Sequence, residues 1–390
     1  MINLPPKKLR SGMVTGQGIY NSQGVTLLTK GTELDEKYIK KLQRLELSSL
    51  NVTSLNPELK IQPPDDLIQE KTRMQVIYRL IDIFDEVKST GRFNMEALTD
   101  IAEKIIADLV SRQKNLVQLT DIRLHDSYTF VHSVNVSVLA SMLGIACGCT
   151  EAEILDITLG GLLHDIGKIY IPQDVLNKPG KLTAAEMNKV RKHPEIGERK
   201  LREANAFSLS VIKIANQHHE HMDGKGYPSQ LTDKRIHRFA RMVAIADVYD
   251  ALTSTRPYKK AYKPSIAYKI MTKFCQGQFD PELLCRFFDN VAIYPVGTVL
   301  KTTLGYAIVK QIEFEHTRTP VIYIFASKRG KPIFPPRKIN LSNYKDSYIE
   351  SIVDSNDLSM LVSQVGFDPA QYLINEEKEN SSIVKEEQIE

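Results

Sequence analysis

The pattern of apolar and polar positions divides the chain into parts of different character. Residues 1–64 hold two short β-prone runs separated by turn residues, with an expected helix at 35–45. Pro63-Pro64 marks a joint, and from 65 to about 290 apolar residues recur at helical spacing, as at Leu80 and Phe84. The predicted fold class is therefore mainly α, with a small N-terminal α/β module.

The pattern changes again after Tyr294, where β-rich runs alternate with turns and predict a small antiparallel appendage at 293–345. The last segment, 346–390, ends in a polar, acidic tail that we expect to be disordered. We divide the helical part into a linker region at 65–120 and a core domain at 121–292. The core domain holds eight of the nine histidines, which points to chemistry in this part of the chain.

Composition narrows the class of protein. With 42% hydrophobic and 25% charged residues, the chain matches soluble globular proteins, and its formal charge of +4 is too small for a nucleic-acid polymer as partner. The longest apolar stretch, Val136–Cys147, is too short to span a membrane, and the first thirteen residues lack the apolar core of a signal peptide. The four cysteines fit neither a zinc ribbon nor a redox pair. We expect a cytoplasmic protein with reduced thiols.

Several histidines and aspartates stand where packing alone disfavours them. His164-Asp165 follows an apolar helix, and Asp247 interrupts another, where a lone carboxylate is costly unless it binds a cation or a partner such as Arg241. A single histidine is more often a core or surface residue than a ligand. The full set nevertheless offers nitrogen and oxygen donors that favour iron, manganese or zinc. Its members are His132, His164, Asp165, His193, His218, His219 and Asp247.

The order of these residues resembles the HD-GYP domain, a subgroup of the HD superfamily of metal-dependent phosphohydrolases. The resemblance covers about residues 120–290 and implies a helical HD-type bundle core. Its matching segments, in chain order, are YTFVHS at 128–133, HDIGK at 164–168, IP at 171–172, LNKPGKLT at 176–183, HP at 193–194, HHE at 218–220, DGKGYP at 223–228, IADVYDALT at 245–253 and RPYK at 256–259.

The resemblance implies two divalent transition metal ions, iron or manganese, with Asp165 as the bridge. It assigns one ion to His132, His164, Asp165 and Asp247, and the other to Asp165, His193, His218 and His219. Some family members carry a glutamate four residues before the first histidine and bind a third ion. Here that position is Tyr128, so we expect two ions.

The implied activity is hydrolysis of cyclic di-GMP to linear pGpG, and onward to GMP, by attack of a metal-bridging hydroxide. Asp165 and Lys168 are the expected catalytic residues. Lys168 lies one helical turn after His164, so we expect both side chains to face the same way. The expected substrate contacts are Lys168, Arg256, Lys259, Gly226 and Tyr227. In the family the loop at 223–228 is tied to substrate choice and to partner domains, so a signalling-protein partner at this loop is a further expectation. The N-terminal piece resembles the small domain that often precedes HD-GYP cores, and a homodimer formed through it is also expected.

Two alternatives stay open. The chain can be a receptor that binds the cyclic dinucleotide without turnover, or an HD hydrolase of another cyclic nucleotide such as cyclic GMP-AMP. Degenerate family members usually lose ligands, whereas all seven are present here. Between Pro228 and Arg241 the sequence departs from the family pattern, which puts the substrate in doubt and not the enzyme class.

Overall fold

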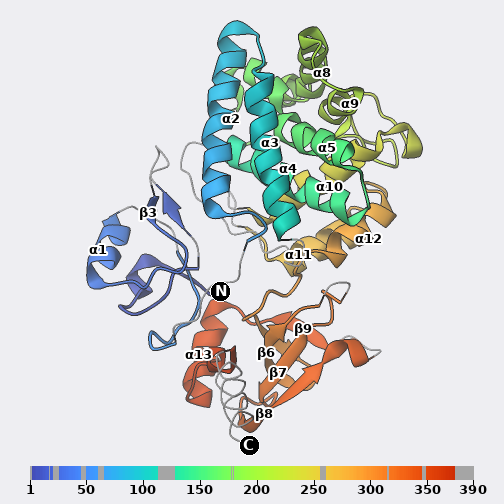
Figure 1. Cartoon of the computed structure of the whole chain (residues 1–390). Coiled ribbons are helices and arrows are strands. Elements are labelled where there is room, and N and C mark those ends of the chain that lie inside the picture. Colours follow the sequence, from blue (N-terminus) through green and yellow to red (C-terminus); the bar gives the residue numbers. More distant parts are fainter. Residues whose placement is uncertain are drawn as a thin grey trace, which may run out of the picture. The chain divides into compact units, whose positions relative to one another are not determined.

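The computed structural model forms two compact units, each described here by itself (Figure 1). The helical unit comprises Ser22–Gly24 and Asp66–Val291, and the terminal unit comprises Met1–Asn21, Val25–Asp65 and Ala292–Glu390. The structure describes residues 2–16, 18–20, 26–44, 50–59, 66–112, 128–176, 178, 180–254, 261–313, 316–344 and 348–373. The joint predicted at Pro63-Pro64 and the predicted acidic tail lie outside these residues.

The helical unit confirms the predicted fold class, because it consists of helices joined by short loops. Its α-helices are α2 (Glu70–Thr90), α3 (Met95–Ser111), α4 (Tyr128–Ala146), α5 (Glu151–Leu163), α6 (Gln173–Leu176), α7 (Ala184–Val190), α8 (His193–Ala204), α9 (Leu209–Gln217), α10 (Arg238–Thr253), α11 (Pro264–Lys269) and α12 (Pro281–Asp289). Shorter helical turns are η2 (Ile166–Tyr170), η3 (Asp233–Arg235) and the π-helical η4 (Ile270–Phe274).

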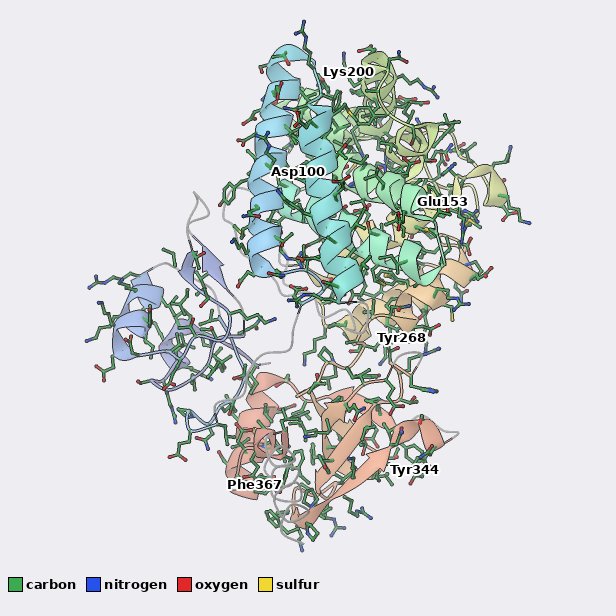
Figure 2. The ribbon with its side chains drawn as sticks, in the orientation of Figure 1. Asp100, Glu153, Lys200, Tyr268, Tyr344 and Phe367 are labelled. Atoms are coloured by element: carbon green, nitrogen blue, oxygen red, sulfur yellow. The ribbon has the colours of Figure 1, made fainter. Side chains whose placement is uncertain are left out.

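Local sequence signals set where several helices begin. A capping box starts α5, where the Thr150 hydroxyl accepts from the backbone N–H of Glu153 and the Glu153 carboxylate, labelled in Figure 2, accepts from that of Thr150. The same box, formed by Thr183 and Glu186, starts α7 as the sequence predicts. These caps satisfy N–H groups that have no partner within the helix.

Helix α4 is the centre of the helical unit and packs against α5, α10 and α2. Within the described residues, α4 is the one helix that is long and apolar enough to cross a membrane. However, 78% of its Thr129–Ala146 window is buried inside the protein, as in a core helix. Gly161 of α5 meets Ser137 of α4 so closely that an added Cβ would lie 2.6 Å from the Ser137 Cα. This close approach fixes the end of α5 against α4.

The terminal unit joins two segments that the sequence analysis treats separately. The predicted N-terminal hairpin and helix are confirmed by the antiparallel pair β2 (Ile19–Tyr20) and β3 (Thr26–Leu28) and by α1 (Glu36–Arg44). The other elements of this segment are η1 (Pro6–Lys8) and the pair β1 (Ile2–Leu4) and β4 (Leu50–Val52).

The C-terminal segment forms an antiparallel sheet of order β8-β7-β6-β5-β9. Its elements are β5 (Val299–Thr302), β6 (Gly305–Gln311), β7 (Val321–Ala326), β8 (Pro332–Asn340), η5 (Leu341–Asn343), β9 (Ile349–Ile352), α13 (Ser355–Val365) and η6 (Pro369–Leu373). The predicted β-rich appendage is thus present, and β9, α13 and η6 extend it beyond the expected end at residue 345.

A buried carboxylate links the two segments of the terminal unit. Asp368 Oδ2 accepts hydrogen bonds from the Ser54 hydroxyl at 2.9 Å and from the backbone N–H groups of Leu55 at 3.0 Å and Asn56 at 3.1 Å. Ile2 and Leu55 also pack against the apolar cluster that contains Val299 and Leu358. The N-terminal segment and the C-terminal sheet therefore share one core.

Candidate metal centre

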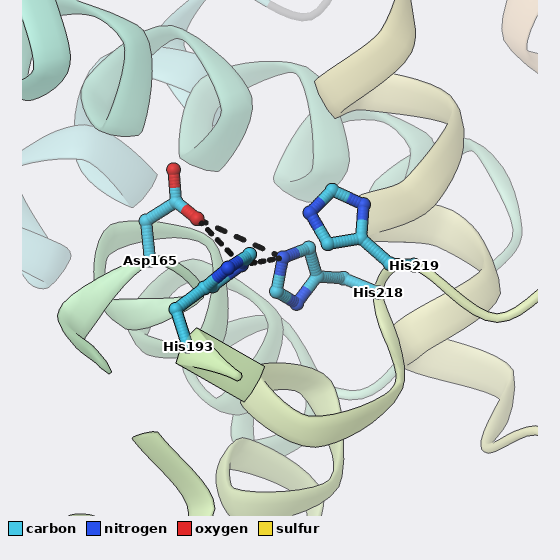
Figure 3. Close-up of side chains that lie close together, drawn as sticks. All are labelled: Asp165, His193, His218 and His219. Carbon is cyan, nitrogen blue, oxygen red and sulfur yellow. Dashed lines mark hydrogen bonds and ion pairs between the residues drawn. The ribbon is translucent and has the colours of Figure 1, made fainter. Parts of the chain in front are cut away.

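The helical unit brings the seven predicted ligands together from five helices or their ends. His132 lies on α4, Asp247 lies on α10, and His193 is the first residue of α8. His164 and Asp165 follow the end of α5, and His218 and His219 follow the end of α9. All are buried except His219, whose side chain is 25% exposed. Figure 3 shows Asp165, His193, His218 and His219 converging on one space.

Backbone and side-chain acceptors fix how four of the imidazoles point. The Nδ1 atoms of His164, His193 and His218 lie 2.7 Å from Gly161 O, 2.8 Å from Val190 O and 3.0 Å from Ala215 O, respectively. His132 Nδ1 lies 2.6 Å from Asp250 Oδ2. Because a carbonyl or carboxylate oxygen can only accept, each Nδ1 carries a proton. In the neutral imidazole each Nε2 then carries the lone pair, which is the usual donor of a histidine ligand to a metal.

The two oxygens of Asp165 face two different groups of imidazoles. Oδ1 lies 3.2 Å from His193 Nε2 and 3.7 Å from His218 Nε2, and these two nitrogens are 3.3 Å apart. Oδ2 lies 3.3 Å from His164 Nε2. The structure thus holds two overlapping ligand groups, each with its donor atoms within 4.8 Å of one another. The first is Asp165, His193, His218 and His219, and the second is His132, His164 and Asp165.

Asp247 closes the space between the two groups. Its Oδ1 lies 3.1 Å from His132 Nε2, and its Oδ2 lies 3.8 Å from His219 Nδ1. The alternative in which Arg241 pairs with Asp247 is not what the structure shows, since Arg241 pairs with Asp280 at 2.5 Å. The Asp247 carboxylate is therefore available to a cation.

Unsatisfied atoms at the centre of the cluster test whether a metal fits. Among the described residues, His164 Nε2 and Asp165 Oδ1 are buried side-chain atoms without a hydrogen-bond partner. Leaving such an atom unpaired costs about 1–3 kcal/mol. Bound cations would satisfy both atoms, and the mixture of imidazole nitrogens with carboxylate oxygens suits iron, manganese or zinc. The residues therefore fit a metal centre.

The groups of the cluster have pKa values shifted in different directions. Burial, reinforced by neighbouring imidazoles, holds the pKa of His218 well below its usual range, and burial lowers the pKa of His219 to about 3. Burial also lowers the pKa of His132, but hydrogen bonds to Asp247 and Asp250 outweigh it and raise that pKa to about 9. Burial raises the pKa of Asp165, but Lys168 and His164 outweigh it and hold that pKa well below the ordinary value.

Asp250 contacts the predicted ligand His132, although the sequence interpretation did not include it in the site. It is fully buried in α10, accepts from His132 Nδ1, and also accepts from Asn135 Nδ2 at 2.8 Å and Ser254 Oγ at 2.7 Å. A signal was present, because Asp250 follows Asp247 by three residues in an apolar helix, and this spacing puts both carboxylates on one face.

Lys168 lies beside the site, but in a 3-10 turn and not on the helix that was expected to carry it. The helix does not continue through it, since α5 ends at Leu163 and Lys168 lies in the 3-10 turn η2. The tight turn at Gly167 is packed against the backbone oxygen of His193, where a Cβ would not fit. Lys168 Nζ lies 2.5 Å from Asp165 Oδ2 and is partly exposed. Its charge is therefore beside the cluster, although the helical spacing argument was wrong.

The glycine-rich loop lies against the ligand His219. The Tyr227 ring stacks on the His219 ring with centroids 4.7 Å apart, and the Arg191 guanidinium lies 5.2 Å from the Tyr227 centroid. Gly226 sits where a Cβ would come 2.5 Å from the Glu220 Cα, so its loop can approach the site closely. The predicted contacts Arg256 and Lys259 and the Tyr128 side chain lie outside the described residues.

Comparisons with known proteins agree with this geometry. The HD domain family matches residues 100–283. A cyclic di-GMP phosphodiesterase of Pseudomonas aeruginosa is 33% identical over 75% of this chain and 67% of its own length. The cyclic di-GMP phosphodiesterase response regulator RpfG of Xanthomonas campestris is 42% identical over 41% of this chain and 43% of its own. The 3'3'-cGAMP-specific phosphodiesterase 3 of Vibrio cholerae is 29% identical over 56% of this chain and 50% of its own length. The chain therefore belongs to the HD domain family, in its HD-GYP group.

Proposed function

We propose that this protein is a metal-dependent phosphodiesterase that hydrolyses cyclic di-GMP to linear pGpG and onward to GMP. The observation that carries the proposal is the buried Asp165 carboxylate, whose two oxygens face separate groups of imidazoles. The relative from Pseudomonas aeruginosa, which aligns over 75% of this chain, is a cyclic di-GMP phosphodiesterase. The chain is thus an HD-GYP phosphodiesterase, and the seven clustered side chains are its proposed hydrolytic centre.

The seven side chains would hold two divalent ions, for which we propose iron or manganese. Two such ions supply Lewis acidity to a phosphodiester and make water acidic enough to act near neutral pH. Within the protein, Asp165 stays ionised at neutral pH because Lys168 and the imidazoles stabilise its charge. Lys168 places a positive charge where the phosphate oxygens of a bound substrate would gather.

Substrate recognition is proposed for the rim of the site. The Tyr227 ring lies on His219 and offers a flat surface at the entrance, while Gly226 keeps the loop close to the ligands. Lys168 is the proposed phosphate contact, and Arg256 and Lys259 are proposed to bind phosphate or guanine edges. Lys225, whose side chain is 80% exposed, makes the same loop available to a signalling-protein partner. We further propose a homodimer and a cytoplasmic location, where a cyclic dinucleotide would meet the site.

Product analysis by chromatography tests the proposal. The purified protein is loaded anaerobically with Fe(II) or with Mn(II) and incubated with cyclic di-GMP, and linear pGpG followed by GMP is the expected result. His164→Ala is the matched control that loses a ligand. An absence of hydrolysis with either metal, together with tight binding of cyclic di-GMP, would instead show a receptor.

A second substrate follows from one specific comparison. The relative from Vibrio cholerae that is 29% identical is specific for 3'3'-cGAMP. The same incubations are therefore run with 3'3'-cGAMP in parallel. A higher kcat/KM for cyclic di-GMP supports the proposal, and a higher value for 3'3'-cGAMP reassigns the substrate while leaving the metal centre in place.

A further inference from the structure

From the contacts around His132 we infer that Arg73, on α2, is a positioning residue for this metal ligand and acts through Asn135 and Asp250. The inference rests on the metal centre proposed above and extends it to a helix before residue 100. The HD domain match begins at residue 100, so it includes neither Arg73 nor its partner Asp66.

A continuous path of hydrogen bonds connects Arg73 to His132. Arg73 Nη1 donates to Asn135 Oδ1 at 2.5 Å, and Asn135 Nδ2 donates to Asp250 Oδ1 at 2.8 Å. Asp250 Oδ2 then lies 2.6 Å from His132 Nδ1. On its other side, Arg73 Nη2 donates to Asp66 Oδ2 at 3.1 Å. All five residues are buried, and Arg73 is fully so.

The chemistry of each group allows only one direction along this path. A guanidinium only donates, so Arg73 obliges Asn135 to present its oxygen on that side and its NH₂ to Asp250. An ionised carboxylate only accepts, so Asp250 keeps the proton of His132 on Nδ1. When His132 is neutral, its lone pair then sits on Nε2, the atom that faces Asp247 and the ligand group of His164. Arg73 thereby fixes both the orientation and the tautomer of a ligand it does not touch.

A purely structural role for Arg73 predicts something different. As a buried ion pair with Asp66, Arg73 would contribute to folding, and its loss would destabilise the helical unit without a preference for either ion. As a positioning residue, it affects the ion on the His132 side selectively. Loss of partners behind a metal ligand typically weakens metal binding about 10–100-fold.

The test measures binding of each ion in full-length variants. Metal-free protein is titrated with Mn(II) by calorimetry, metal content after dialysis is measured by mass spectrometry, and electron paramagnetic resonance reports magnetic coupling between the two ions. In Arg73→Met we expect one ion to bind at least tenfold more weakly, the other to bind as in the wild type, and the coupling to be lost. Asp250→Asn should affect the same ion, and the double variant should lose no more than the more affected single variant.

Matched variants separate positioning from stability. Arg241→Met removes another largely buried arginine of the helical unit, paired with Asp280, and should lower the melting temperature while both ions bind normally. Arg73→Lys keeps the charge and should restore part of the lost affinity. Asn135→Ala breaks the path of hydrogen bonds while leaving the Arg73–Asp66 pair. It therefore tests the positioning role even if Arg73→Met does not fold.

The outcomes distinguish this inference from the metal centre itself. A selective loss in Arg73→Met or Asn135→Ala, with both ions retained in Arg241→Met, supports positioning. Wild-type binding of both ions in Asn135→Ala, or equal weakening of both in Arg73→Met, overturns it. If the wild-type protein itself binds no transition metal, the metal centre fails and this inference with it.

Discussion

Metal binding should depend steeply on pH because of His132. Its pKa in the metal-free protein is about 9, since hydrogen bonds to Asp247 and Asp250 outweigh the effect of burial. A ligand nitrogen must be unprotonated, so the cation competes with a proton at Nε2. At pH 7 only about 1% of molecules have neutral His132, which weakens the apparent affinity about a hundredfold.

The apparent Kd for one Mn(II) ion should therefore fall about tenfold for each pH unit between 6.5 and 8.5. At pH 8, where an ordinary histidine is already neutral, binding should release about 0.9 proton per chain. Calorimetry in two buffers of different ionisation enthalpy measures this release. A Kd that does not change with pH, or no proton release at pH 8, would refute the reasoning.

The same pKa sets an opposite trend for the stability of the metal-free protein. Because the folded-state pKa of His132 is raised above about 6.5, its protonation contributes about 3 kcal/mol that is fully present below pH 6.5. That contribution is lost as pH rises through 9. The melting temperature of metal-free protein should fall over this window, and thermal unfolding followed by circular dichroism checks it. In Asp250→Asn the pH dependence of Mn(II) affinity and that of the melting temperature should both be weaker, because Asp250 helps to raise the pKa of His132.

Three further predictions concern the centre and its loop. Asp165→Ala should abolish hydrolysis and reduce bound metal, while far-ultraviolet circular dichroism stays helical; wild-type turnover would contradict the bridging role. Lys168→Ala should lower kcat more than metal content, and parallel loss of both would make it structural. Gly226→Ala should raise KM and lower stability by about 1–3 kcal/mol, as for overpacking, because the new methyl group meets the Glu220 backbone; unchanged KM and melting temperature would count against this loop geometry.

Part of the proposed ligand set follows from the cost of burying polar groups in apolar helices, and the resemblance to HD-GYP domains implies the rest. Asp247 and His132 stand in apolar helices, where only a bound cation or partner repays their burial. Arg73 could not be found in this way, since 62 residues separate it from Asn135 and no local pattern relates them. Lys168 lies beside the cluster as expected, but the helical spacing used to place it was wrong, because α5 ends at Leu163.

The strands of the terminal unit illustrate the same limit. The β-rich runs at 306–312 and 320–325 predict β6 and β7, because the composition of each run is a local signal. The N-terminal segment is joined to the C-terminal segment by the hydrogen bond between Ser54 and Asp368. No local pattern in either segment predicts this contact. Such pairings come from tertiary packing, which sequence periodicity does not encode.

The N-terminal and C-terminal segments share one core, so this core can form only after both segments have been synthesised. Ser54 leaves the ribosome 314 residues ahead of Asp368, a delay of roughly 15–60 s at about 5–20 residues per second. Residues 66–291 of the helical unit, which include all seven proposed metal ligands, are synthesised within that interval. Until then Ile2 and Leu55 lack the apolar surface that covers them, so the terminal unit can complete its core only after every proposed metal ligand has been synthesised.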